Sequence, residues 1–333
     1  MDSHHKRGVN RSKKGKSMKD FIIGIDIGGT HLRIGAVDRA GQVSFFEKRE
    51  SCAVSGEGGS GARLIALICA YMVQNGLEDR VAAIAIGFPS TVSRDKRIVY
   101  SSPNLPLDGA GGLDGQDVVA LLSRELGLPA FIDKDTNVLL QYDLVRLNLK
   151  DKGCTIGIYY GTGIGNAVFL NGKFLAGKHG VACELGHIPY FGSENLCGCG
   201  SRGCAETHAG GYVLRNLWRA HYSDEPFSEL FLRHGGDARI QNFIEAMAIP
   251  LATELNLFDP DQVIVGGGVV EMAGFPMERL LGFLREFVRK PYPGEDFALL
   301  RASAAPEAGV VGAAYYAMDH LDGFTTQAKE ANE

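Results

Sequence analysis

The sequence contains no apolar run that approaches the roughly 20 residues of a membrane-spanning helix, and its first residues lack the apolar middle of a signal peptide. It also lacks the Gly-x4-Gly-Lys-Ser/Thr sequence of P-loop enzymes. No full Gly-x-Gly-x-x-Gly run leads from a strand into a helix, which argues against a dinucleotide-binding fold. These absences predict a cytoplasmic protein with no membrane contact.

A disulfide framework is not expected either, because the seven cysteines are odd in number and three are bunched in Cys-x-Cys-x4-Cys spacing. These three are Cys197, Cys199 and Cys204, and His187 precedes the first of them by ten residues. Thiolate and imidazole groups are the ligands of tetrahedral zinc, and a set of three cysteines and one histidine leaves no position open for water. The sequence therefore predicts a structural Zn²⁺ site in the loop 187–204.

Charge is distributed unevenly along a chain of 333 residues whose net charge is −5. Residues 1–19 hold seven lysines or arginines and a single acidic residue, and they show no apolar periodicity. This composition predicts a disordered basic tail. Binding of nucleic acid by the tail is the alternative, but a solvated terminus is favoured and no specific nucleic-acid partner is expected.

The chain repeats one local pattern, a pair of strands joined by a tight glycine-rich turn. The predicted pairs are 21–27 with 31–38, around Gly28-Gly29-Thr30, and 154–160 with 165–170, around Gly161-Thr162-Gly163. Each pair opens about half of the protein. We therefore expect an internally duplicated chain of two α/β domains that face one another.

Helices and further strands are predicted between and after these pairs. The predicted helices are 62–74, 117–126, 138–149, 212–221, 239–257, 275–289 and 309–320, and the predicted strands are 81–86, 131–133 and 263–265. Proline lacks the backbone N–H that a helix interior needs, so we expect Pro250 to interrupt the helix 239–257.

Three glycine-rich turns at the ends of predicted strands indicate a nucleotide site. Glycine lets backbone N–H groups approach an anion closely, and Thr30 adds a hydroxyl donor. Asp26, at the end of its strand, suits a hydrated Mg²⁺, although an ordinary glycine hairpin with an exposed aspartate is the alternative. The candidate residues for ATP and Mg²⁺ are Asp26, Gly28, Gly29, Thr30, Arg33, Gly161, Thr162, Gly163, Gly266, Gly267 and Gly268.

The order of the motifs resembles that of the ROK family of sugar kinases over about residues 20–320. The resemblance rests on residues 26–33, 103–105, 161–163 and 266–268, and on Asp135, Glu184 with His187, and the three cysteines with Glu206. It implies an actin-like, ribonuclease-H-like fold of mixed sheets and helices, in two lobes with ATP in a central cleft. It also implies a homodimer and a hexose or amino-hexose substrate that is phosphorylated on its terminal hydroxyl.

The same resemblance implies a lobe boundary and roles for single residues. The N-terminal lobe would span 20–135, completed by a C-terminal helix at about 309–321, and the second lobe would span 136–308. Asp135 matches the family's catalytic base, and its alternative role is the N-cap of the helix predicted from Val138. The positions that match sugar-contacting residues are Asn104, Glu184, His187 and Glu206, where carboxylates accept hydrogen bonds from hydroxyls and an amide also donates them.

Lys134 departs from the family pattern, in which asparagine usually precedes the catalytic aspartate. A basic residue at this position resembles the D-allose kinases of the family, as does the segment 87–107. Allose differs from glucose only at its 3-hydroxyl, so a changed donor beside the base is a plausible discriminator and Lys134 a candidate substrate-binding residue. The alternatives are that Lys134 points to solvent or pairs with Asp133, and that the substrate is glucose, fructose or N-acetylmannosamine.

A sugar-responsive repressor is the alternative from another functional class, since ROK regulators share the same body. Such regulators carry a helix-turn-helix domain of about 60 or more residues ahead of it. About twenty residues precede the first predicted strand here, without helical patterning, and Asp135 is retained. We therefore expect an enzyme.

Overall fold

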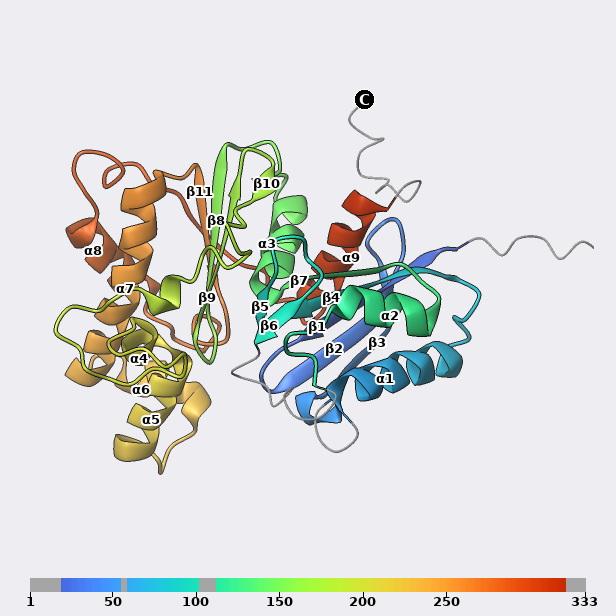
Figure 1. Ribbon diagram of the computed structural model, residues 1–333. Coiled ribbons are helices and arrows are strands. Elements are labelled where there is room, and N and C mark those ends of the chain that lie inside the picture. The colour runs from blue at the N-terminus through green and yellow to red at the C-terminus, as the bar shows by residue number, and fades with distance from the viewer. Residues whose placement is uncertain (1–18, 55–58, 102–111, 322–333) are drawn as a thin grey trace, which may run out of the picture.

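The computed structural model describes residues 19–54, 59–101 and 112–321. Two five-stranded sheets occupy the two halves of the molecule, with helices α3 (Asp135–Arg146) and α9 (Ala308–His320) between them (Figure 1). The candidate Asn104 and the expected basic tail, apart from Lys19, lie outside the described residues. The positions of the candidate site residues follow from how these two sheets are built.

The first sheet has the strand order β3-β2-β1-β4-β7. Its strands are β1 (Phe21–Ile27), β2 (His31–Val37), β3 (Val43–Glu50), β4 (Val81–Phe88) and β7 (Ala130–Lys134). β1 pairs with β2 in antiparallel and with β4 in parallel orientation, and β7 continues the parallel side. Every residue of β1 and β4 is buried, as expected for central strands with both faces covered.

The second sheet repeats this arrangement strand for strand, in the order β10-β9-β8-β11-β12. Its strands are β8 (Cys154–Tyr160), β9 (Ile164–Leu170), β10 (Lys173–Phe174), β11 (Gln262–Gly266) and β12 (Leu299–Arg301). β8 again pairs with its hairpin partner in antiparallel and with β11 in parallel orientation. The predicted internal duplication is therefore confirmed.

Amphipathic helices cover the sheets with their apolar sides. Helices α1 (Ser60–Gln74) and α2 (Val118–Leu126) share a buried cluster with the first sheet, whereas α5 (Gly211–His221), α7 (Ala238–Phe258) and α8 (Met277–Phe287) share one with the second. The short helices α4 (Glu206–Ala209) and α6 (Leu230–His234) lie in the second half, and β5 (Thr91–Val92) pairs with β6 (Val99–Ser101) as a separate hairpin. None of the helices in the described ranges is long and apolar enough to cross a membrane.

Helix α9 brings the end of the described chain back to the first sheet (Figure 1). A Cβ on Gly24 of β1 would lie 2.1 Å from the carbonyl oxygen of Val310, and a Cβ on Gly312 would lie 1.8 Å from that of Val138 in α3. Only glycine permits these approaches. These two contacts hold α9 between β1 and α3. The lobe boundary at residue 135 stays a prediction.

The structure corrects several expected elements. Helix α7 runs unbroken through Pro250, because its residues on both sides of the proline are buried and tertiary packing outweighs the lost hydrogen bond. Helix α3 begins at Asp135, three residues before the predicted start, and α8 is shorter than expected at both ends. Strands β3, β10 and β12 were not predicted, since they are partly exposed and two of them have only two or three residues.

Candidate active site

The first glycine-rich turn lies between β1 and β2 and presents an exposed tip. Gly29 and Thr30 are exposed, whereas the carbonyl groups of Gly28 and Thr30 are hydrogen-bonded to Ser51. The Ser51 hydroxyl donates to the carbonyl oxygen of Gly28 at 2.6 Å, and its backbone N–H donates to that of Thr30 at 2.9 Å. A rigid turn whose tip faces outward suits the binding of an anion by backbone N–H groups.

Asp26 is the penultimate residue of β1, beside this turn, and is buried, with 6% of its surface exposed. Its carboxylate accepts a hydrogen bond from Arg33 at 3.0 Å, across the β1–β2 pair. Burial raises the pKa of Asp26, and the charge and hydrogen bond of Arg33 oppose that rise. The alternative of an exposed aspartate on an ordinary hairpin is therefore wrong, and Arg33 faces Asp26.

The two other predicted turns lie side by side at one end of the second sheet, because β11 pairs with β8 so that Gly266 is opposite Tyr159. Gly267 has a φ of +91°, and a Cβ there would lie 2.6 Å from the Tyr160 carbonyl oxygen. Only glycine fits this position without strain. The structure thus places the turns 161–163 and 266–268 next to each other.

The turn 161–163 is held by residues that follow the cysteine-rich loop. Gly211 and Tyr212 donate their backbone N–H groups to the carbonyl oxygens of Gly161 and Thr162, both at 3.0 Å. The carboxylate of Glu206 accepts the N–H of Ile164 at 2.8 Å. Glu206, a candidate sugar contact, therefore braces a turn assigned to the nucleotide.

Asp135 is the first residue of α3, and its carboxylate accepts the N–H of Thr136 at 2.7 Å. Burial and the nearby charge of Asp26 raise the pKa of Asp135 to about 7, while the Thr136 hydrogen bond and Lys134 act in the opposite direction. The alternative that Asp135 is the N-cap of this helix is wrong, because Lys134 occupies that position. A carboxyl group with a pKa near neutrality is suited to accept a proton.

Asp135 also lies between the two hairpins that carry glycine turns. Its pKa responds to Asp26 at the first hairpin, and the adjacent Thr136 packs so closely on Gly165 of β9 that a Cβ there would be 2.4 Å from its methyl group. Carboxylate oxygens are hard ligands of the kind Mg²⁺ binds. Asp26 therefore remains the candidate ligand of Mg²⁺ that the sequence predicts.

Lys134 is buried, with 8% of its surface exposed, and forms an ion pair with a second candidate residue. Its ammonium nitrogen lies 2.7 Å from one carboxylate oxygen of Glu184, and the other oxygen lies 3.8 Å from Nε2 of His187. Both alternatives for the Lys134 side chain are wrong, since its ammonium group neither points to solvent nor pairs with Asp133, whose carboxylate binds Lys96 instead. Lys134, Glu184 and His187 form one chain of polar groups.

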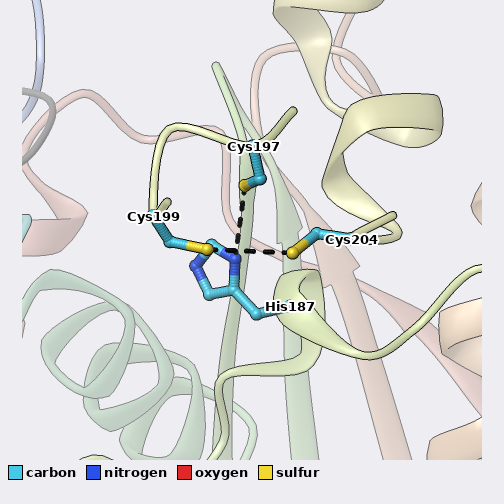
Figure 2. A group of neighbouring side chains, drawn as sticks. All are labelled: His187, Cys197, Cys199 and Cys204. Carbon is cyan, nitrogen blue, oxygen red and sulfur yellow. Dashed lines mark hydrogen bonds between the residues drawn. The ribbon is translucent and has the colours of Figure 1, made fainter. Parts of the chain in front are cut away.

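The ligand atoms of His187, Cys197, Cys199 and Cys204 lie within 4.8 Å of one another (Figure 2). Nδ1 of His187 is 3.6 Å from Sγ of Cys197, and Sγ of Cys199 is 3.7 Å from that of Cys204. A tetrahedral ion with Zn–S bonds of about 2.3 Å places its sulfur ligands about 3.8 Å apart. The four side chains therefore fit Zn²⁺, and Nε2 of His187 remains directed at Glu184.

The sequence reasoning missed the residues that support this site from behind. Ser51 follows β3 and ties the first turn, and Lys96 reaches Asp133 at the end of β7. Gly309, at the start of α9, lies so close to Asp26 that a Cβ there would be 2.5 Å from its carboxyl carbon. No local pattern marks these contacts, because each joins segments that are distant in the sequence.

A comparison with protein families identifies the architecture to which this site belongs. The model of the ROK family matches residues 22–320. The chain belongs to the ROK family. The predicted actin-like, duplicated α/β fold is confirmed by this match together with the two repeated sheets and the solved neighbours of the family.

Individual relatives match almost the whole of the chain. The glucokinase of Thermotoga maritima is 27% identical, and the match covers 91% of this chain and 98% of that protein. The N-acetyl-D-glucosamine kinase of Aliivibrio salmonicida is 28% identical, and the match covers 88% of this chain and 98% of that protein. A ROK family glucokinase from Streptomyces griseus, solved in complex with glucose and AMPPNP, has a TM-score of 0.72 and 26% identity over 88% and 98%.

Proposed function

We propose that the chain transfers the γ-phosphoryl group of ATP to the 6-hydroxyl of a free hexose, with D-allose preferred. The enzymatic class, a sugar kinase, rests on the family and on kinases that match nearly the full chain. The observation that carries the proposal is the position of Asp135, a carboxyl group with a pKa raised to about 7 between two glycine-rich hairpins. Phosphoryl transfer depends mainly on positioning and on neutralisation of charge, which this arrangement supplies.

Asp135 would act as the general base. It would orient the 6-hydroxyl and take its proton as the oxygen attacks the γ-phosphorus, while the bond from phosphorus to the departing ADP oxygen breaks. Bound Mg²⁺ would neutralise phosphate charge, and Asp26 is the residue that we assign to it. The turns 28–30, 161–163 and 266–268 would hold the nucleotide through backbone N–H groups and the hydroxyls of Thr30 and Thr162.

The sugar would be read by the polar chain beside the base. Glu184 and Glu206 would accept hydrogen bonds from hydroxyls, and His187 would contact the sugar while Nδ1 binds the structural zinc. Asn104 would add an amide that both donates and accepts. These roles are proposals. The homodimer that the family resemblance implies is a proposal as well, and the molecular mass of the protein in solution tests it.

The raised pKa of Asp135 predicts a pH dependence of turnover. Below its pKa of about 7 the carboxyl is protonated and is too weak a base to take the hydroxyl proton, so kcat/KM should fall about tenfold per pH unit. Above that pH the value should reach a plateau. A pH series from 5 to 9 on the wild type measures this, and an Asp135→Asn variant should lack the step; an identical step in both would assign it to another group.

Lys134 supports D-allose, because a buried cation that holds Glu184 replaces the asparagine usual in the family. We expect Lys134→Asn to lower the ratio of kcat/KM for D-allose to that for D-glucose by about tenfold or more, since an amide does not hold the carboxylate by charge. Lys150→Asn is the matched control, because Lys150 pairs with Asp319 outside the site. An unchanged ratio in Lys134→Asn would exclude Lys134 as the selector.

A panel of hexoses tests the function as a whole. ADP release coupled to a spectroscopic signal is measured with MgATP and D-allose, D-glucose, D-fructose, N-acetylglucosamine or N-acetylmannosamine. The proposal expects the highest kcat/KM for D-allose. A higher value for another sugar would make the chain a kinase of that sugar, and absence of turnover with all of them would favour a sugar-binding regulator.

A further inference from the structure

Lys96 lies in the turn between β5 and β6, yet its ammonium group reaches the strand that leads to the base. Its nitrogen is 2.5 Å from Oδ1 of Asp133, 37 residues further along the chain. The Lys96 side chain is 17% exposed and that of Asp133 only 1%. An ion pair at this depth is sensitive to the loss of either partner, because a lone buried charge is costly.

Asp133 connects this ion pair to the first turn of α3. The same carboxylate oxygen accepts the backbone N–H of Lys134 at 2.7 Å and the side-chain amide of Asn137 at 2.8 Å. These two residues flank Asp135. The position of the Asp133 carboxylate therefore sets where the helix begins and how Asp135 is presented.

The turn that carries Lys96 is itself fixed. The Ser93 hydroxyl accepts the backbone N–H groups of Arg97 at 3.2 Å and Ile98 at 2.9 Å, and Lys96 has a φ of +56°, in the left-handed region. On its other side, the turn meets the loop that leads to Glu184, where a Cβ on Gly180 would lie 2.5 Å from the backbone nitrogen of Arg94. The β5–β6 turn thus contacts both the strand before the base and the loop before Glu184.

We propose that Lys96 is a positioning residue for phosphoryl transfer, which acts through Asp133 to hold the start of α3 and the Asp135 carboxylate in a productive orientation. This inference rests on the proposed function of Asp135. In this role Lys96 would touch neither substrate and would hold the end of the strand that leads to the base. Small displacements of a reacting group cost much rate, so the effect falls on kcat rather than on substrate binding.

The test compares Lys96→Met, Lys96→Arg and Lys150→Met. We expect Lys96→Met to lower kcat about tenfold to a hundredfold, with KM for the hexose and for ATP within about threefold of the wild type. Lys96→Arg keeps the charge and should recover most of the loss. Lys150→Met removes a lysine from another ion pair, at the opposite end of α3, and should leave kcat unchanged.

A double variant keeps the test decisive if Lys96→Met folds poorly. Lys96→Met with Asp133→Asn leaves no unpaired buried charge, so it should fold. If the two residues act as one unit, kcat of the double variant stays within about threefold of that of Asp133→Asn alone. The inference would be overturned if the two substitutions multiply their losses of kcat in the double variant. It would also be overturned if Lys96→Met retains the kcat of the wild type.

Hydrogen exchange separates this inference from the proposed function. The backbone amides at the start of α3, residues 135–138, should exchange faster in Lys96→Met than in Lys150→Met, whether or not the protein turns over any sugar. Unchanged exchange in active protein would refute the positioning role. If the wild type phosphorylates no hexose, the proposed function fails, and the exchange comparison still decides whether Lys96 orders the start of α3.

Discussion

Replacing Asp135 with asparagine is expected to lower kcat at least a hundredfold while KM for the hexose changes little. The amide keeps the shape of the side chain and an oxygen that accepts the N–H of Thr136, at 2.7 Å in the wild type, but it does not take the proton of the hydroxyl. General-base assistance contributes about 10² to 10⁴-fold to a rate. Steady-state kinetics with saturating MgATP measures both parameters, and the split between kcat and KM identifies a role in the chemical step.

The same substitution should not destabilise the fold. The carboxyl of Asp135 has a pKa raised from 3.8 to about 7, so the folded state holds its proton longer than the unfolded chain does. Ionisation of this group therefore lowers stability as pH rises from about 4 to about 7, and the cost persists above that range. At pH 8 we expect Asp135→Asn to melt no lower than the wild type.

A matched control for this variant is Asp319→Asn, because Asp319 binds Gln141 and Lys150 on the far side of the site. Its kcat should remain within about twofold of the wild-type value. If Asp135→Asn turns over the hexose as fast as this control, Asp135 is not the base.

Removal of the proposed zinc ion is expected to lower activity and melting temperature together. The four ligands close the loop 187–204, and both ends of that loop belong to the site, since His187 faces Glu184 and Glu206 braces the turn 161–163. Zinc bound by these four ligands would supply a structural cross-link, and its binding free energy would become folding free energy. Strong chelation, or Cys204→Ser, should therefore cut kcat/KM by about tenfold or more and lower Tm by several degrees.

Three measurements make this prediction specific. Metal analysis of the purified protein should find one zinc ion per chain, and restoring Zn²⁺ after chelation should recover activity. Cys69→Ser is the matched control, because Cys69 lies on α1 outside the cluster. A fully active preparation that contains no metal would contradict the structural role.

Much of the fold could be predicted because its signals are local. The hairpins β1–β2 and β8–β9 each consist of two apolar runs around a glycine turn, so strand type, turn position and duplication were all readable in the chain. The cysteine cluster is equally local, since its ligands lie within one short loop. The strands β3, β10 and β12 were missed, because partly exposed edge strands have no continuous apolar run.

The residues that surround the candidate base could not be predicted from local sequence patterns. Lys134 was expected at the sugar, in solvent or on Asp133, and it binds Glu184, 50 residues away. Asp133 is held by Lys96, which no motif marked. Ion pairs between distant segments depend on which loops the two sheets bring together, and a single sequence does not encode that proximity as a pattern.

The sequence by itself therefore determined the duplicated hairpins, the set of zinc-ligand candidates and the class of glycine turns, because each depends on residues that are neighbours in the chain. Only the tertiary structure decided that Asp26 is buried, that the pKa of Asp135 is raised to about 7, and that Lys134 pairs with Glu184. Burial and charge pairing are properties of groups that folding brings together, and they set the proton affinity on which the proposed chemistry depends.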